Sequence, residues 1–291
     1  MFRGSLIAIV TPFKKGRVDE RALGDLIEFQ IANGTHGIVP CGTTGESATL
    51  SHDEHNRVIA FTVEAVKRRV PVIAGSGSNS TEEAIALTQF AKKTGADAAL
   101  LITPYYNKPT QEGLYRHYKA VAEAVDLPLV LYNIPGRTSV NMLPSTVARL
   151  STIRNIVAIK EGSASLQQVS EIIQACGERM TVLSGDDPLT LPMMAVGATG
   201  VITVTANIAP KDMAGMVDAW AAGRFEEAKR LHYKLYPLFT ALFLETNPIP
   251  VKEALALMGR IDGEMRLPLC PMGQENRDKL IRAMKDYGLL T

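Results

Sequence analysis

Asn155-Ile156-Val157-Ala158-Ile159-Lys160 is an apolar run, rich in β-branched residues, that ends in a lysine. This pattern predicts a buried β-strand, because β-branched side chains favour strands and a strand covered on both faces shows no polar alternation. An ammonium group at the end of such a strand loses part of its hydration, which is costly unless it has a partner or a chemical role. Lys160 is therefore the first candidate for a functional residue.

Two interpretations of Lys160 are open at this point. A lysine amine in a poorly hydrated site can act as a nucleophile and form a Schiff base with a carbonyl substrate. Alternatively, the side chain packs its stem against the strand and extends its charged end into water.

The run belongs to a set of eight similar runs, which predict eight strands. They cover 6–10, 37–40, 71–74, 98–103, 129–132, 156–160, 181–184 and 201–204. Helical spacing appears between them at 19–33, 53–68, 81–94, 111–125 and 166–176, and Gly34 and Gly95 mark two helix ends. Strands that alternate with helices pair in parallel, so the sequence predicts an α/β fold, a closed (β/α)8 TIM barrel.

Beyond residue 223 the sequence predicts helices only, at 225–244, 250–258 and 275–287. We therefore expect a catalytic barrel over residues 1–223 and a C-terminal helical region over residues 224–291.

The composition is that of an ordinary enzyme. The 291 residues are 46% hydrophobic and carry a net charge of +1, so neither nucleic acid nor an anionic membrane is an expected partner. Cys41, Cys176 and Cys270 are odd in number and far apart, which favours reduced thiols in the cytoplasm over disulfides or a zinc site. The N-terminal apolar run is too short for a signal peptide or a membrane span.

Polar residues follow most of the predicted strands, at the barrel end where TIM-barrel enzymes place their chemistry. The segment Gly42-Thr43-Thr44-Gly45-Glu46 is either a plain turn or a carboxylate site built from amides and hydroxyls. Tyr132 is either a core phenol or an acid/base group, and Arg137 either a solvated loop residue or a carboxylate clamp. We expect Asp186 and Asp187 to be structural, as the N-cap of a helix starting at Pro188.

These segments resemble those of a known enzyme family. Gly42-Thr-Thr-Gly-Glu46, Tyr132-Asn-Ile-Pro-Gly-Arg-Thr138 and Lys160 after Val-Ala-Ile are similar to the signature segments of the class I, Schiff-base pyruvate aldolase superfamily. Within it, the dihydrodipicolinate synthase family is most similar, and the likeness extends nearly end to end, from Gly4-Ser5 to Asn247-Pro-Ile-Pro-Val-Lys252. Gly162 is a small departure, since relatives more often carry a side chain there.

The resemblance implies a lyase that condenses pyruvate with L-aspartate 4-semialdehyde in the diaminopimelate route to L-lysine. It implies no cofactor, because Lys160 itself forms the imine, and a cytoplasmic homo-oligomer, expected to be a tetramer. The implied catalytic residues are Lys160, Tyr132, Thr43 and Tyr106, the last acting across a subunit contact. Substrate binding is implied for Thr44, Gly185 and Ile202 at the pyruvyl end and for Arg137 at the semialdehyde carboxylate.

The resemblance further implies inhibition by L-lysine at a cleft beside the dimer contact. The matching positions are Ser47, Ala48, His52, His55, Asn79, Glu83 and Tyr105. A structural interpretation stands beside this one, since Ser51 with Glu54 and Ser80 with Glu83 both fit capping boxes.

Three alternatives remain. N-acetylneuraminate lyase and 2-keto-3-deoxygluconate aldolase share the imine but usually lack an arginine at the position of Arg137. A non-catalytic barrel that binds a keto acid would show no imine chemistry. A metal-dependent aldolase is disfavoured, because His52 and His55 fall on the first turn of an outer helix with no third ligand at suitable spacing.

Overall fold

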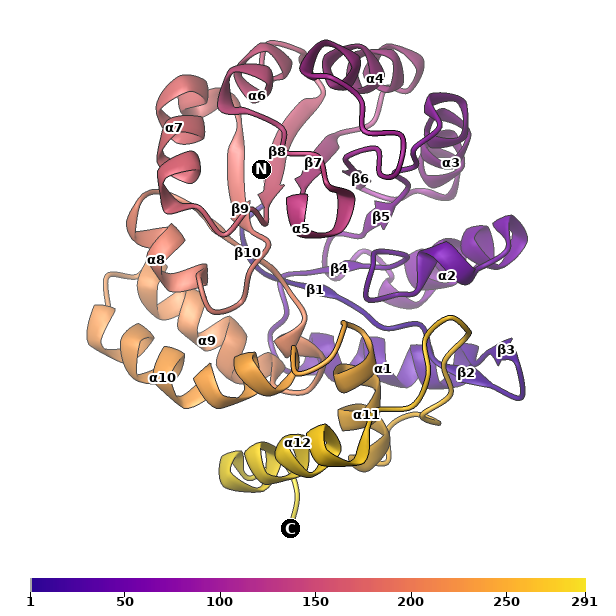
Figure 1. The fold of residues 1–291 in the computed structure, drawn as a ribbon, viewed down its shortest axis with the longest axis vertical. Helices are drawn as coiled ribbons and strands as arrows, with labels where there is room; N and C mark the ends of the chain where they lie inside the picture. The colour runs from indigo at the N-terminus through magenta and orange to yellow at the C-terminus, as the bar shows by residue number, and fades with distance from the viewer. Residues whose placement is uncertain (1) are drawn as a thin grey trace.

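Eight parallel strands form a barrel at the centre of the protein (Figure 1), as a computed structural model of residues 2–291 shows. The strands are β1 (Gly4–Ala8), β4 (Gly37–Val39), β5 (Ile73–Gly75), β6 (Ala98–Ile102), β7 (Leu129–Asn133), β8 (Ile156–Glu161), β9 (Thr181–Ser184) and β10 (Gly200–Thr203). Each matches one predicted apolar run to within a few residues. The predicted (β/α)8 fold is confirmed.

The barrel closes between β4 and β5. The eight-stranded sheet has the order β4-β1-β10-β9-β8-β7-β6-β5, and a parallel bridge between Ile38 and Val72 joins its two ends. The amide of Ile38 donates to Pro71 O at 2.9 Å, and the amide of Gly75 donates to Pro40 O at 2.9 Å. Closure removes both sheet edges and brings the carboxyl ends of all eight strands to one mouth.

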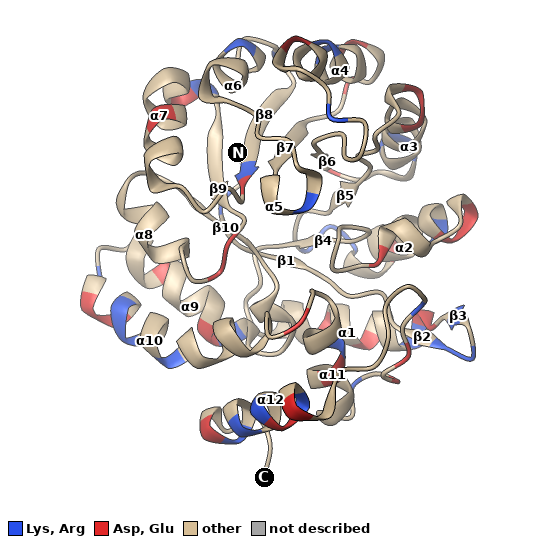
Figure 2. Ribbon diagram, in the orientation of Figure 1, with Lys and Arg blue, Asp and Glu red and all other residues tan. Residues whose placement is uncertain are grey.

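Alternation along the strands divides the buried side chains into two cores. Leu6, Val130, Ala158, Leu183 and Ile202 belong to the core inside the barrel. Their neighbours in sequence face outward and pack against the helices in a second, larger core. Figure 2 shows the result, with charged residues on helices and loops and almost none along the strands.

Most barrel strands are followed by helices that cover the outside. These are α2 (His52–Val66), α3 (Thr81–Thr94), α4 (Gln111–Ala124), α6 (Pro144–Leu150), α7 (Leu166–Cys176), α8 (Thr190–Ala195) and α9 (Pro210–Ala221), with α1 (Glu20–Ala32) after β1. The short helix α5 (Pro135–Thr138) follows β7 and lies over the mouth of the barrel (Figure 1). A small hairpin of β2 (Phe13–Lys14) and β3 (Arg17–Val18) precedes α1. Gly34 and Gly95 follow helix ends as predicted, and both take positive φ values, 84° and 88°.

The last part of the chain is helical, as expected. Helices α10 (Phe225–Ala241), α11 (Ile249–Leu257) and α12 (Gln274–Tyr287) lie together beside the barrel (Figure 1). The division of the chain at residue 223 stays a prediction. No helix within residues 2–291 is long and apolar enough to cross a membrane.

Candidate active site

Lys160 lies at the mouth of the barrel, near the end of β8. It is only 6% exposed, and alternation with Ala158 directs its side chain to the inside. Tyr132 of β7 is its register partner, and the Lys160 Nζ lies 4.3 Å from the centre of the Tyr132 ring. Within residues 2–291 no hydrogen bond or ion pair joins the Lys160 amine to another group. A buried amine without a carboxylate partner is free to react with a carbonyl.

Asp187 lies in the same mouth, and its predicted role as an N-cap is wrong. Helix α8 begins at Thr190 with Leu189 as its N-cap, so neither Asp186 nor Asp187 caps it. Asp187 Oδ2 instead accepts hydrogen bonds from the amides of Val204 and Thr205, at 3.1 and 2.8 Å, and from Thr205 Oγ1 at 2.6 Å. Burial raises the pKa of this carboxyl, while these hydrogen bonds and the nearby Lys160 charge oppose the rise.

The predicted pyruvyl-end residues Gly185 and Ile202 flank this mouth. Ile202 lies in β10, is 1% exposed and belongs to the inner core with Tyr132. Gly185 follows β9, and its amide donates to Glu161 O at 2.8 Å. A Cβ at Gly185 would come within 3.1 Å of that oxygen, so the close approach of the two strand ends favours glycine there.

The loop after β4 carries Thr43 and Thr44 and lies against a distant part of the chain. Thr44 is 2% exposed, and its Oγ1 accepts a hydrogen bond from Asn247 Nδ2 at 3.0 Å. Arg137 of α5 is exposed, and its Nη2 donates to the backbone oxygen of Asn247 at 3.0 Å. Asn247 thus contacts both Thr44, predicted to bind the pyruvyl end, and Arg137, predicted to bind the semialdehyde carboxylate.

Tyr106 points away from the chain that carries it. It is 90% exposed and takes φ +71°, and no hydrogen bond within residues 2–291 joins it to Thr43 or joins Thr43 to Tyr132. The relay of these three residues stays a prediction, and a phenol exposed in this way is available to a neighbouring subunit.

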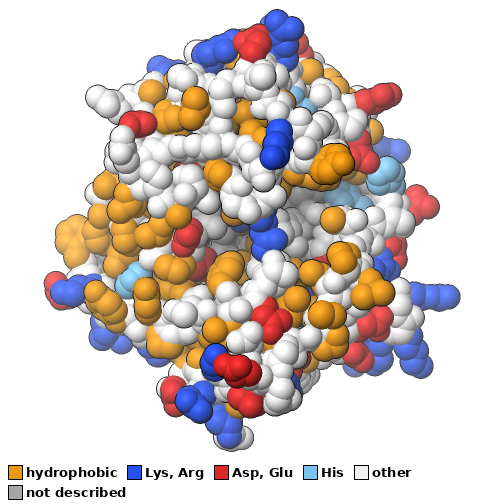
Figure 3. Space-filling view, viewed as in Figure 1, with side chains coloured by type: hydrophobic (Ala, Val, Ile, Leu, Met, Phe, Trp, Pro, Cys, Tyr) orange, Lys and Arg blue, Asp and Glu red, His pale blue; other side chains and the backbone are white. Residues whose placement is uncertain are grey.

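A cavity of about 440 Å³ opens beside the loop that carries Thr43, and it appears as part of the hollow in Figure 3. Its lining combines Thr43, Arg137, Thr138 and Asn247 with six of the seven predicted lysine-site residues: Ser47, Ala48, His52, His55, Glu83 and Tyr105. The seventh, Asn79, does not line it; the backbone oxygen of Asn79 accepts a hydrogen bond from Asn107 Nδ2 at 2.9 Å. Lys160 does not line this cavity either.

The polar groups of the cavity have distinct charge states. Burial lowers the pKa of His55 to about 4, with a contact to the Gly75 backbone opposing part of the shift, so this imidazole is neutral at pH 7. A hydrogen bond from Ser78 holds the pKa of Glu83 below its usual range, which keeps the carboxylate charged. His55 Nδ1 is buried without a partner, while Glu83 also accepts from His52 Nε2 at 2.9 Å.

Only one of the two predicted capping boxes forms. Ser51 and Glu54 bond reciprocally at the start of α2, as expected. Ser80 accepts from the amide of Glu83, but the Glu83 carboxylate turns to Ser78 and His52, so the second box is wrong. No group of three or more His, Cys, Asp or Glu within residues 2–291 is arranged to hold a metal ion.

Sequence reasoning gave no role to Asn247, Glu46 or Lys252. The last two form an ion pair whose side chains are 1% and 0% exposed. Lys252 follows the apolar residues 249–251, as Lys160 follows an apolar run, but Glu253 comes directly after it and its partner Glu46 is 206 residues away in the sequence.

Comparisons with known proteins agree with this architecture. The model of the "Dihydrodipicolinate synthetase family" matches residues 1–287. The 4-hydroxy-tetrahydrodipicolinate synthase of Geotalea uraniireducens is 64% identical over 100% of both chains, and that of Thermodesulfovibrio yellowstonii 61% over 100% of both. The crystal structure of dihydrodipicolinate synthase from Aquifex aeolicus has a TM-score of 0.98 at 52% identity and covers 99% of both chains.

Fold and site together define a (β/α)8 barrel with a buried lysine at the catalytic end of its strands. The chain belongs to the dihydrodipicolinate synthetase family, as its sequence segments predict. It is therefore a lyase of the Schiff-base type, and enzymes of this family need no cofactor.

Proposed function

We propose that this enzyme condenses pyruvate with L-aspartate 4-semialdehyde to 4-hydroxy-tetrahydrodipicolinate, in the diaminopimelate route of L-lysine biosynthesis. The observation that carries the assignment is the Lys160 amine, buried at the barrel mouth against Tyr132 and free of any carboxylate partner within residues 2–291. Family membership and the names of the full-length relatives support the choice of substrates.

The chemistry starts with attack of the Lys160 amine on the pyruvate ketone. Loss of water gives an imine, and loss of a methyl proton converts it to an enamine, because the protonated imine accepts the electron pair. The enamine carbon attacks the aldehyde and leaves a hydroxyl group there. The substrate amine then displaces Lys160 from the imine carbon, which closes the ring and frees the enzyme with one water released overall.

Each predicted residue has a task in this sequence. Tyr132, next to the amine, moves protons to and from the imine, with Thr43 and Tyr106 as the relay to solvent. Thr44, Gly185 and Ile202 hold the pyruvyl end. Arg137, whose guanidinium is fixed on one side by Asn247 O, takes the semialdehyde carboxylate.

Borohydride trapping tests the assignment directly. Incubation with pyruvate and borohydride should add one pyruvyl mass, and peptide mapping should place it on Lys160 and leave Lys252 unmodified. A coupled assay with both substrates should show turnover. Trapping without turnover would redirect the assignment to another pyruvate aldolase, and no trapping would favour a keto-acid-binding barrel.

L-Lysine is the proposed inhibitor, bound in the cavity beside Thr43. The charged Glu83 suits an ammonium group, and the unpartnered, neutral His55 Nδ1 can accept a hydrogen bond from another. A structural relative at 43% identity, dihydrodipicolinate synthase from Cyanidioschyzon merolae, was solved with lysine bound.

Titration of L-lysine at fixed pyruvate tests this regulation. We expect partial inhibition of the wild type and little response of Glu83→Ala, because that variant lacks the carboxylate that faces the effector. Glu82→Ala is the matched control, since its side chain is exposed and outside the cavity. Equal inhibition of all three proteins would place the effector site elsewhere, and an unresponsive wild type would remove the regulatory proposal.

A cytoplasmic homotetramer is also proposed. The exposed Tyr106 supports a subunit contact at the active site. Apolar side chains gather around α8 and α10 (Figure 3), where Tyr233 is 66% and Tyr236 47% exposed, and this supports a second contact. One relative, 45% identical, is described as a monomeric dihydrodipicolinate synthase variant, so sedimentation analysis is the deciding measurement.

A further inference from the structure

The loop over residues 42–46 is held in a conformation that its own sequence does not favour. Cys41 and Glu46, the non-glycine residues on either side of Thr43 and Thr44, take positive φ values of 55° and 52°. Such conformations are costly for residues with a Cβ and persist only where the surroundings impose them. The contacts that impose them therefore decide where the two threonines lie.

The strongest of these contacts comes from α11. Lys252 Nζ lies 2.5 Å from Glu46 Oε1 and donates to Thr11 O at 3.0 Å. It also lies 4.4 Å from the centre of the Phe13 ring. Both charged side chains are almost completely buried, and a buried ion pair is a weak source of stability because desolvation offsets the attraction. What the pair does fix is the position of Glu46 relative to α11.

A second contact from the same segment reaches the site itself. Asn247, two residues before α11, donates from Nδ2 to Thr44 Oγ1 at 3.0 Å. The bond occupies an acceptor position of the threonine hydroxyl and leaves its hydrogen free to donate to a substrate carboxylate. The backbone oxygen of Asn247 accepts from Arg137, so one residue contacts both Thr44 and Arg137.

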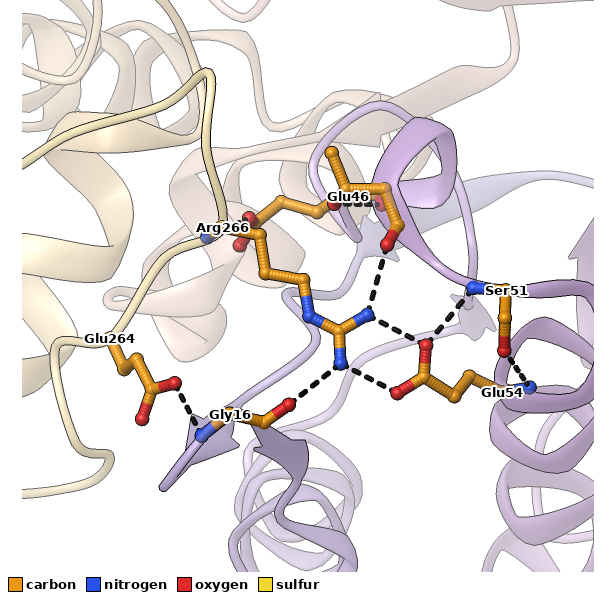
Figure 4. A network of polar contacts seen from close by, with 7 residues as sticks. Gly16, Glu46, Ser51, Glu54, Glu264 and Arg266 are labelled. Atoms are coloured by element: carbon orange, nitrogen blue, oxygen red, sulfur yellow. Dashed lines mark hydrogen bonds and ion pairs between the residues drawn. The ribbon is translucent and has the colours of Figure 1, made fainter.

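The other oxygen of Glu46 extends this arrangement to the surface. Glu46 Oε2 accepts from the amide of Arg266 at 3.2 Å, and the Arg266 guanidinium donates to Glu54, Gly16 and Thr49 (Figure 4). Glu264 accepts from the amide of Gly16 at 2.6 Å. The loop thus lies between α11 on one side and the network around Arg266 on the other.

We propose that α11 and Asn247 are positioning elements of the active site: Lys252, through Glu46, and Asn247, through Thr44, hold the 42–46 loop where the condensation requires its threonines. The proposal rests on the proposed function and extends the active site into the C-terminal helical region. Neither residue touches the reacting atoms.

The first test removes both buried charges together. In Glu46→Gln/Lys252→Met no uncompensated charge remains, so the variant should fold with a thermal midpoint close to that of the wild type. We expect kcat/KM for pyruvate to fall about ten- to hundredfold, since small displacements of binding groups have effects of this size. A folded double variant with wild-type kcat/KM would overturn the positioning role.

The second test separates the two contacts of Asn247. Asn247→Ala removes the amide that binds Thr44 but keeps the backbone oxygen that binds Arg137. The KM for pyruvate should rise while the KM for the semialdehyde changes little. Equal changes in both, or no change, would contradict this role, because a loss of general stability does not discriminate between substrates.

Arg277→Gln is the matched control, since Arg277 of α12 donates to Glu253, the neighbour of Lys252 on α11, at 2.6 Å and, within residues 2–291, forms no hydrogen bond or ion pair with the 42–46 loop. The kcat/KM of this variant for pyruvate should match that of the wild type. A loss as large as that of the double variant would show that any disturbance of α11 lowers activity, and would overturn the specific role of the Lys252–Glu46 and Asn247–Thr44 contacts. Borohydride trapping is run on every protein. Failure of the wild type to trap pyruvate would overturn the proposed function, whereas normal trapping with unimpaired variants would overturn the positioning role alone.

Discussion

Lys160 and Lys252 are both buried lysines that follow apolar residues in the sequence, yet their surroundings differ in one decisive respect. Lys252 has a carboxylate at 2.5 Å and a backbone oxygen at 3.0 Å. Lys160 has an aromatic face at 4.3 Å and, among residues 2–291, takes part in no ion pair and no hydrogen bond. A paired lysine is held in place by its partners, whereas an unpaired amine at the mouth of the barrel is available for chemistry.

The largest expected effect comes from removing the unpaired lysine. Lys160→Ala should remain folded and lose pyruvate trapping and nearly all turnover, because the site has no other nucleophile for the imine. Lys160→Arg should behave alike, since a guanidinium does not deprotonate usefully. Circular dichroism measures folding, borohydride trapping measures imine formation and the coupled assay measures turnover. Turnover above a few per cent of wild type would contradict the role of Lys160 as the imine-forming residue.

Removal of the paired lysine should, unlike removal of Lys160, lower the stability of the fold. Lys252→Met leaves the Glu46 carboxylate buried without its partner, so we expect a loss of about 3–5 kcal/mol in the free energy of unfolding. Denaturant titration of Lys252→Met beside the doubly neutral variant checks the cause. If both proteins lose the same stability, the uncompensated charge is not the reason.

Arg137 is an intermediate case, an exposed cation with one backbone partner. Arg137→Ala should lower kcat/KM for the semialdehyde by about ten- to hundredfold, the range of a charged hydrogen bond of about 1.5–3 kcal/mol. Trapping of pyruvate on Lys160 should stay intact. Tyr132→Phe is the counterpart that should slow imine formation itself, and an exchange of these two phenotypes would reverse the assigned roles.

The smallest expected effect concerns the ion pair between Arg266 and Glu54, which adjoins the buried pair of Lys252 and Glu46. Two hydrogen bonds from Arg266 lower the pKa of Glu54 to about 2, below an unfolded value of about 4.3. The stabilisation is complete above pH ~4.3 and is lost as the pH falls toward 2. Glu54→Gln should lose about 1–3 kcal/mol at pH 7, because part of the pair is exposed to solvent. Unfolding titrations at pH 7 and pH 3 should show the difference between the two proteins narrowing; a constant difference would exclude the pair as its source.

The strands were predictable because each signal is local. A parallel strand buried on both faces must be continuously apolar, and this placed all eight strands and set Lys160 at the end of one. Interactions between distant residues were not predictable in the same way. Asp187 carries the local signal of an N-cap, but the amides of Val204 and Thr205 compete for its carboxylate. Glu83 loses its capping box to Ser78 and His52 for the same reason.

The same distinction applies to the site. Tyr132 lies near the end of β7 and Arg137 lies in α5, the short helix that follows it, so the barrel alone puts them at the mouth. Lys252 reaches it from α11 and Asn247 from the segment just before that helix, and no barrel strand immediately precedes either of them. Their partners Thr44 and Glu46 are more than 200 residues earlier. A lysine on a helix is solvated by default, and only the folded chain shows that this one is enclosed.

The separation of these partners also has a consequence for the order in which the enzyme is made. All eight barrel strands have been synthesised by residue 203, but the loop after the second one meets Asn247 and Lys252 only after a further stretch of chain has left the ribosome. Contacts this distant in sequence form late, because closing the intervening loop is entropically costly. We expect a nascent chain to acquire its barrel before it acquires catalytic competence, with the docking of α11 as the step that separates the two.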